Sequence, residues 1–381
     1  MVPNLRFLEF KEEYDEKLLS DILSRVSKPV KIRENEKYYQ IGIRSHSKGL
    51  FYKEPETGKQ IGNKRIFWIE PNCLIVNIVF AWEQAVSITT EKEIGMVASH
   101  RFPMYKVYDN NLLYVNFFFK TEKGKQLLQM ASPGGAGRNK TLNQDFFLNS
   151  KVMLPEEKEQ VKISKMLSLI EQRIETQIKI IDDLLTVKNG ISNKLFKLQQ
   201  IELSNHYLSE YLTEGDKTAV DTSCYKKITV KLNKQGLAFS ELNREMADSR
   251  PFYVRHKGEL IIGKQNYFNG SIAVVTEQFD NCICSNAIMS FKINNIDSDF
   301  LYYQISNNNY LNSQSYKANG TGQKELSEKE FLNFKIWRPH LEVQQKIVNC
   351  FKSFDFKIEN EKAILDSYIQ EKNYLLNNLF I

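Results

Sequence analysis

The chain of 381 residues lacks the features that mark membrane proteins, secreted proteins and metalloproteins. Its five cysteines are scattered, and only Cys282 and Cys284 lie close together. A metal site would need a second Cys or His pair nearby, and the five histidines show no ligand spacing, so we expect reduced cysteines in the core. No apolar run approaches the roughly 20 residues that span a bilayer. The first ten residues are mixed and charged, unlike a signal peptide, so we expect a cytoplasmic protein.

Motifs for catalysis are also missing. The sequence has no Asn-Pro-Pro-aromatic run for amino methylation, no His-Glu-x-x-His and no Gly-x-Ser-x-Gly. These absences argue against a stand-alone enzyme and predict a non-catalytic chain.

Charge gives only a weak signal. The net charge is +6, and residues 1–150 carry most of the excess, with 22 basic and 17 acidic side chains. Residues 201–338 are balanced, with 16 of each. This distribution permits nucleic-acid binding without requiring it.

A 49-residue stretch occurs twice without a gap, at 148–196 and 332–380, with sixteen identical positions. Pro155 and Pro339 are equivalent, as are Gln160 and Gln344. Such a repeat indicates two copies of one structural unit, and paired units tend to pack about a pseudo-two-fold axis.

Each copy predicts a helix of about 40 residues, roughly 60 Å long. Apolar residues repeat at heptad positions a and d, from Ile163 to Leu195 and from Ile347 to Leu379. Sustained heptads favour a coiled coil over the alternative of two amphipathic helices packed separately on their own domains. The polar exceptions fall at equivalent places in the two copies, namely Gln177, Lys188, Glu361 and Lys372.

The segments outside the repeat are rich in predicted strands and resemble each other faintly. Residues 74–76 match 260–262, and residues 105–107 match 291–293, at nearly the repeat spacing. We therefore predict an α+β fold in which two similar mixed α/β domains are joined by two long helices that form an antiparallel coiled coil. The expected boundaries are 1–154 and 198–338 for the domains, and 155–197 and 339–381 for the helices.

This pattern resembles the DNA specificity (S) subunit of type I restriction-modification systems. The likeness lies in the stretch from Pro155 to Ile163, the long heptad helix and the ending Asn193–Phe196. The second copy repeats these features, and residues 3–7 and 41–49 are similar to first-domain segments of that family.

The resemblance implies two target-recognition domains, each reading one half of a bipartite double-stranded DNA sequence. It also implies that the helices set the spacing and dock two methylating subunits, through which restriction subunits join. The chain itself would bind no cofactor, since S-adenosylmethionine, ATP and Mg would belong to the partner subunits. A coiled-coil adaptor with two protein-binding heads is the alternative.

Basic or amide side chains beside Gly-, Ser- or Asn-rich turns are the candidate DNA contacts, because arginine can bind guanine edges and lysine can meet phosphate. In the first domain these are Arg44, His46, Lys48, Lys64, Arg65, Arg101, Arg138 and Lys140. In the second they are Arg244, Arg250, Arg255, Lys264, Lys317, Gln323 and Lys324.

The polar seam residues predict a helix register. If polar layers face each other, Gln177 pairs with Lys372, and Lys188 pairs with Glu361, so that paired residue numbers sum to 549. Other registers would bury unpaired polar groups. Ile163 and Ile347, near the helix starts, would pack on the globular domains.

Overall fold

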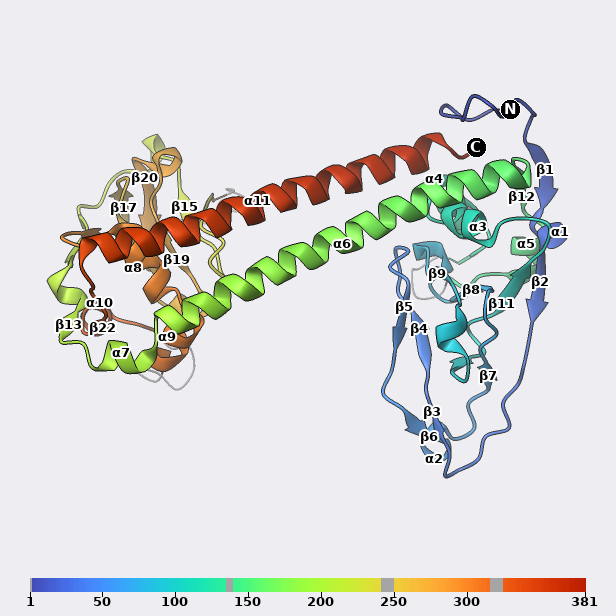
Figure 1. Ribbon diagram of the computed structural model, residues 1–381, viewed down its shortest axis with the longest axis horizontal. Helices are drawn as coiled ribbons and strands as arrows, with labels where there is room; N and C mark the ends of the chain where they lie inside the picture. The colour runs from blue at the N-terminus through green and yellow to red at the C-terminus, as the bar shows by residue number, and fades with distance from the viewer. Residues whose placement is uncertain (1, 135–139, 241–249, 316–324) are drawn as a thin grey trace. The chain divides into compact units, whose positions relative to one another are not determined.

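The computed structural model of the protein describes residues 2–134, 140–240, 250–315 and 325–381. The chain divides into two compact units, each combining one globular segment with part of both long helices (Figure 1). Unit 1 comprises Met1–Ile178 and Ala363–Ile381, and unit 2 comprises Lys179–Lys362.

Each unit contains a four-stranded antiparallel sheet with the same strand order. In unit 1 the order is β2 (Leu23–Val26), β11 (Met104–Val107), β8 (Leu74–Val76) and β9 (Val86–Ile88). In unit 2 it is β14 (Leu212–Glu214), β21 (Ile288–Ile293), β18 (Leu260–Gly263) and β19 (Ile272–Val274).

The strand register confirms the faint sequence echo between the two segments. Tyr105 lies opposite Leu74 in unit 1, and Phe291 lies opposite Leu260 in unit 2. These four positions are fully buried, because the sheet centre is covered on both faces. The two units therefore use one fold with different loops.

Smaller two-stranded sheets accompany each large sheet. Unit 1 has β4 (Ile41–Ile43) with β5 (Leu50–Tyr52), β7 (Ile66–Trp68) with β10 (Val97–Ser99), and β1 (Asp15–Leu18) with β12 (Lys151–Leu154). Unit 2 has β15 (Ile228–Val230) with β16 (Leu237–Phe239), β17 (Phe252–Arg255) with β20 (Cys282–Ser285), and β13 (His206–Tyr207) with β22 (Lys335–Ile336).

Three short helices pack against the sheet in each unit, and polar side chains cap their starts. Asn111 caps α3 (Leu112–Phe118), Thr121 caps α4 (Glu122–Met130) and Asn143 caps α5 (Gln144–Leu148). Their counterparts are α8 (Ser298–Ile305), α9 (Asn308–Gln314) and α10 (Glu328–Leu332), capped by Asp297, Asn307 and Ser327. Each cap accepts a hydrogen bond from a backbone N–H of the first turn, which would otherwise lack a partner.

The two predicted long helices are α6 (Glu157–Leu195) and α11 (Leu341–Asn378). Every predicted a and d position in both helices is buried or half-buried, including the polar ones. In both units the contacts run in opposite directions along the two helices. In unit 1, Glu171 contacts Lys372 and Arg173 contacts Tyr368; in unit 2, Lys188 contacts Asp355 and Phe196 contacts Phe351. The predicted antiparallel pair is confirmed.

Both helices also belong to the cores of the globular segments, as expected for their first apolar positions. Ile163 and Leu167 join the main cluster of unit 1, and Ile347 and Phe351 join that of unit 2. An aromatic residue that follows each long helix is buried in the same cluster, Phe380 in unit 1 and Phe196 in unit 2. No helix within the described part of the chain is long and apolar enough to cross a membrane.

The identical glutamines of the repeat connect helix and domain in the same way in each unit. Gln160 accepts from the Asn111 backbone N–H at 2.9 Å and donates to the Pro155 carbonyl at 2.8 Å. Gln344 makes the equivalent bonds with Asp297 at 3.0 Å and Pro339 at 2.8 Å. Each glutamine is 1% exposed. This side chain therefore joins the start of a long helix to the cap of α3 or α8.

The predicted pairing of the seam lysines is wrong. The Lys372 ammonium lies 2.6 Å from Glu171, and the Lys188 ammonium pairs with Asp355, so both pairs sum to 543 instead of 549. Glu361 binds Lys357 of its own helix at 2.5 Å. The prediction assumed that polar residues face each other across the seam, whereas long lysine side chains reach carboxylates one position beyond an a residue of the partner helix.

Candidate nucleic-acid interface

The β4–β5 hairpin of unit 1 ends in a six-residue turn that carries three of the predicted DNA contacts. Arg44, His46 and Lys48 are all exposed. Arg44 donates to the Leu50 carbonyl at 3.0 Å, and its guanidinium lies 5.4 Å from the Phe51 ring centroid. Both contacts hold the guanidinium against the strand end, while the residue stays exposed.

Backbone contacts hold this turn in place. His46 and Ser47 adopt left-handed φ values of 58° and 55°, which direct their N–H groups inward. These groups donate to the carbonyls of Glu83 at 2.6 Å and Gln84 at 3.0 Å, at the end of the short helix η1 (Ala81–Glu83). The basic side chains therefore extend from a rigid turn, which limits the conformational entropy lost on binding.

Two further predicted contacts lie at one end of the β7–β10 pair. Arg65 directly precedes β7, and Arg101 closely follows β10, where Ser99 lies opposite Ile66. The Arg65 carbonyl accepts from the His100 N–H at 3.1 Å, which places these two residues side by side. Arg65, His100 and Arg101 are exposed or nearly so, and Lys64 is exposed next to them.

The two groups face the same end of unit 1. A parallel bridge joins Gln40 to Val97, so β4 and β10 run in one direction and their following turns lie toward one end. The Arg101 carbonyl accepts from Ile78 at 3.0 Å, a few residues before η1. Lys140 joins this end, because its ammonium lies 5.0 Å from the Trp82 ring centroid.

We call this surface the basic end of unit 1. It consists of Arg44, His46, Lys48, Lys64, Arg65, Arg101 and Lys140. The structure thus brings together every candidate of the first domain except Arg138, which lies outside the described residues.

Unit 2 carries an equivalent tethered turn between β15 and β16. The N–H groups of Asn233 and Lys234 donate to the carbonyls of Asn269 at 2.8 Å and Gly270 at 2.9 Å, at the end of η6 (Tyr267–Asn269). Both residues have left-handed φ values, 55° and 59°, as His46 and Ser47 do. Lys231 occupies the position of Arg44 and is exposed.

Sequence reasoning missed Lys231 and Lys234. Their signal was the glycine that ends both turns, Gly49 and Gly236, which aligns the two hairpins once the strands are superposed. Lys234 is half-buried and donates to the Asn308 side chain at 2.7 Å. Burial lowers the pKa of Lys234, and Lys188 lowers it further.

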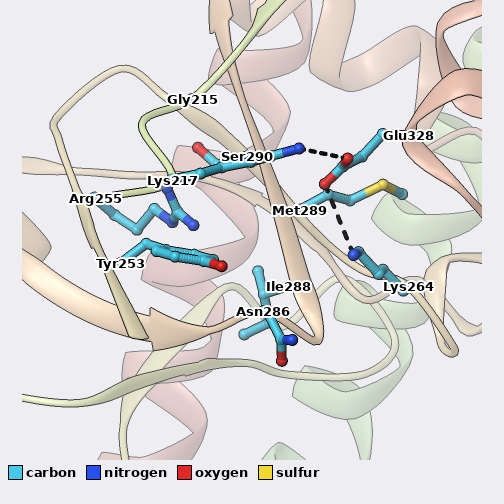
Figure 2. A pocket seen from close by; sticks show the side chains of 10 residues that line it. All are labelled: Gly215, Lys217, Tyr253, Arg255, Lys264, Asn286, Ile288, Met289, Ser290 and Glu328. Carbon is cyan, nitrogen blue, oxygen red and sulfur yellow. Dashed lines mark hydrogen bonds and ion pairs between the residues drawn. The ribbon is translucent and has the colours of Figure 1, made fainter. Parts of the chain in front are cut away.

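Two candidates of the second domain line a small cavity of about 170 Å³ (Figure 2). Lys264 lies on the side of Glu328, 3.7 Å from that carboxylate, and the Lys217 ammonium reaches the same carboxylate at 2.7 Å. Arg255 and the Tyr253 ring form the opposite wall, as Figure 2 shows. Lys217 donates hydrogen bonds to Glu214 and Glu328, which raise its pKa, so Lys217 stays cationic.

Arg255 does not reach the surface, and its prediction as a DNA contact is not supported. The side chain is 2% exposed. Its Nε donates to Cys284 Sγ at 3.1 Å and its Nη1 to the Asp216 carbonyl at 2.9 Å. The sequence places this arginine near a turn. It does not show that Arg255 is the last residue of β17 and that its side chain points into the domain.

Of the remaining candidates in the second domain, one lies within the described residues. Arg250 is exposed two residues before β17, as Lys64 is two residues before β7 in unit 1. The others, Arg244, Lys317, Gln323 and Lys324, lie outside the described residues. Cys282 and Cys284 are buried free thiols, and no group of three His, Cys, Asp or Glu residues among the described ones could hold a metal.

Comparison with known proteins gives one family. Residues 76–185 and 181–367 match the model described as the type I restriction modification DNA specificity domain. The MjaVIII specificity subunit of Methanocaldococcus jannaschii, a type I restriction enzyme subunit, is 24% identical over 267 residues, which cover 62% of this chain and 63% of that protein. The putative MjaX specificity subunit of the same organism is 23% identical over 326 residues, covering 77% of this chain and 76% of that protein. The chain thus spans less than two thirds of the first relative's length.

Solved structures agree on the fold. The S subunit of a type I restriction-modification system from M. genitalium has a TM-score of 0.60 at 14% identity, with 100% of this chain and 99% of that chain covered. A chain from a study of complex assembly and conformational transition of the type I R-M system has a TM-score of 0.59 at 12% identity, with 98% and 99% covered. At such identities the likeness concerns the fold alone.

Proposed function

Because the chain belongs to the family of type I restriction modification DNA specificity domains, we propose that it is a non-catalytic subunit that reads a bipartite double-stranded DNA sequence, one half with each unit. The observation that carries this proposal is the tethered hairpin turn, which recurs at the same place in both units. In each unit an exposed cation, Arg44 or Lys231, begins that turn.

The chemistry of this surface suits recognition. Exposed arginines and lysines supply phosphate contacts and bidentate contacts to guanine. Different side chains on one rigid frame give each unit its own sequence preference. The His46 and Lys48 positions of unit 1, for example, are Asn233 and Gln235 in unit 2. Amide side chains favour adenine where basic ones favour guanine or phosphate.

The proposal extends to partners. The helix pair α6–α11 would dock two methylating subunits, and restriction subunits would join through the assembled complex in the cytoplasm. S-adenosylmethionine, ATP and Mg would then be bound by those subunits. The names of the curated relatives, which are specificity subunits of type I restriction enzymes, support this arrangement.

Methylation mapping in cells tests the proposal. Cells that carry the gene should show a bipartite methylated motif that disappears on deletion. Replacing residues 201–334 with those of a relative should change one half of the motif and keep the other. Loss of both halves with a folded chimaera would contradict the two-reader assignment. An unchanged methylome, together with salt-insensitive binding to DNA, would favour a protein-binding adaptor.

A further inference from the structure

Unit 1 has an open apolar groove outside the basic end. It lies between α4, β12 and Ile381 and has a volume of about 490 Å³. Met130 and Phe146 line it and remain 66% and 53% exposed. Two exposed lysines, Lys123 and Lys151, stand at its rim. Large apolar side chains that stay this exposed around a hollow mark a surface for a partner.

In unit 2 the corresponding place is filled by α7 (Leu198–Glu202), which directly follows α6. This short helix packs on β22 and α9, the counterparts of β12 and α4 (Figure 1). Ile201 is 2% exposed and belongs to the main core cluster of unit 2. The internal repeat therefore shows what kind of segment this groove accepts.

A lysine that is identical in the two copies of the repeat also relates the α7 site of unit 2 to the groove of unit 1. Lys335 donates to the Glu202 carbonyl at 3.1 Å and so binds the last turn of α7. Its equivalent in unit 1 is Lys151, at the groove rim. Lys151 pairs with Glu16 at 2.6 Å, but both side chains are more than half exposed. Breaking this ion pair so that Lys151 can bind a partner would therefore cost little free energy.

The start of the chain does not fill the groove of unit 1. The Leu5 N–H donates to the Asn378 carbonyl at 3.0 Å, and Arg6 and Tyr14 bind Glu159. This segment thus follows the ends of the long helices, and none of its described residues, from Val2 on, lines the groove. We propose that the groove between α4 and β12 docks a short amphipathic helix of a partner polypeptide.

The repeat also specifies the chemistry of that helix. Two apolar residues three positions apart, like Leu198 and Ile201, would enter the groove beside Met130 and Phe146. The last carbonyls, or an acidic residue like Glu202, would lie at Lys151, where a cation complements the negative end of a helix. The docking site lies outside the basic end, so it does not depend on which DNA is read.

A peptide binding experiment tests this proposal. The probe is a fluorescent peptide of residues 197–205, added to the full chain and followed by anisotropy. We expect saturable binding that weakens at least about tenfold for the Met130→Glu chain, because a charge then faces the apolar side of the peptide. The Ile94→Glu chain, changed at a residue that is 58% exposed outside the groove, should bind normally. A peptide with Ile201→Asp should not bind.

A second experiment links the helix covalently to the chain, so that docking can be detected even if the free peptide binds weakly. Residues 198–205 are appended after Ile381, and the matched control carries aspartate at the Ile201 position of the tail. The apolar tail should raise the thermal midpoint by about 2 °C or more over the control, because the tether makes docking intramolecular. Equal midpoints together with no peptide binding would overturn the proposal. Self-association of the native chain that Met130→Glu abolishes would assign the groove to a second copy and also overturn it.

Discussion

In unit 1 the Lys372 ammonium lies 2.6 Å from the Glu171 carboxylate, and the residues 184 positions away, Lys188 and Asp355, form the same ion pair in unit 2. Each carboxylate also holds a residue of the globular segment. Glu171 binds Lys120 at 2.7 Å, and Asp355 accepts from Tyr303 at 2.8 Å. The carboxylate thus connects both helices with the globular segment of each unit.

Removing the carboxylate should cost more stability in unit 1. Glu171→Gln leaves two lysine ammoniums facing each other, at 16% and 24% side-chain exposure, without their shared counter-charge. We expect a loss of about 2 kcal/mol, seen as a fall of about 2–4 °C in the thermal midpoint. Asp355→Asn should cost about half as much, because Asp355 is 40% exposed and its second partner is a neutral tyrosine. Equal losses in the two variants would contradict this reasoning.

The same ion pairs predict an acid-sensitive contribution. Burial acts to raise the pKa of Glu171, but Lys120 and Lys372 outweigh it and hold the pKa below its ordinary value. A carboxyl with a depressed folded-state pKa stabilises the fold above its unfolded pKa, and this stability is lost as the pH falls through the folded value. The midpoint difference between the native chain and Glu171→Gln should therefore be constant from about pH 6 to 8 and shrink below about pH 4.5. A difference that is unchanged at about pH 3 would show that the effect is not electrostatic.

The basic end of unit 1 predicts a salt-dependent weakening of DNA binding on mutation. The triple variant Arg44→Ala, Lys48→Ala and Arg101→Ala should bind random duplex DNA less tightly. The slope of log K against log salt should fall by up to about 0.9 for each phosphate that these side chains no longer neutralise. Lys11, Lys158 and Lys165 are also exposed but lie outside the basic end, and their triple alanine variant is the charge-matched control. Equal slopes for the two triple variants would argue for binding by net charge alone.

The sequence alone was sufficient for the architecture because the signals were periodic. Heptads from Ile163 to Leu195 predicted the helix pair, and the echo of residues 74–76 in 260–262 predicted two copies of one sheet. The register was not predictable in this way. A lysine reaches several ångströms along a helix, so Lys188 and Lys372 found carboxylates about one heptad from the expected layers.

The candidate interface was predicted unevenly for a similar reason. A turn rich in Gly and Ser marks an exposed loop, and this was sufficient to predict that Arg44, His46 and Lys48 lie at the surface. It does not show on which side of a strand a neighbouring arginine lies, so Arg255 was mistaken for a surface residue. Lys231 was missed because a single shared glycine, Gly49 and Gly236, relates the two turns in sequence, whereas tertiary hydrogen bonds to η6 show their equivalence in the structure.

Arg255 should therefore act on stability and not on DNA. Arg255→Ala removes hydrogen bonds to Cys284 and Asp216 and the contact with the Tyr253 ring, and it opens a buried cavity. We expect a loss of about 3 kcal/mol. At temperatures where the variant is folded, its salt slope for DNA should equal that of the native chain. The control is Lys257→Ala, since the Lys257 side chain is 62% exposed and should contribute little to stability. A reduced salt slope for folded Arg255→Ala would show that Arg255 contributes to DNA binding after all.

The paired glutamines offer a test of whether the two units are joined to their helices by the same device. Gln160→Leu leaves the Asn111 N–H and the Pro155 carbonyl without partners in a buried place, and Gln344→Leu does the same to Asp297 and Pro339. Each unsatisfied group costs about 1–3 kcal/mol, so either change should loosen the first turn of α3 or α8.

Hydrogen exchange read by mass spectrometry can follow the two places separately. Gln160→Leu should speed exchange at the start of α3 and leave α8 unchanged, and Gln344→Leu should do the reverse. Gln345→Leu, at the exposed neighbouring position, is the control and should change neither. The effect in unit 1 should be the larger, because Gln160 also donates to Asn110 at 2.7 Å, whereas Gln344 makes only the two shared bonds among those described. If Gln344→Leu left α8 as protected as before, the glutamine would be a passive core residue, and the angle between helix and domain would have to be held by apolar packing around Phe351 instead.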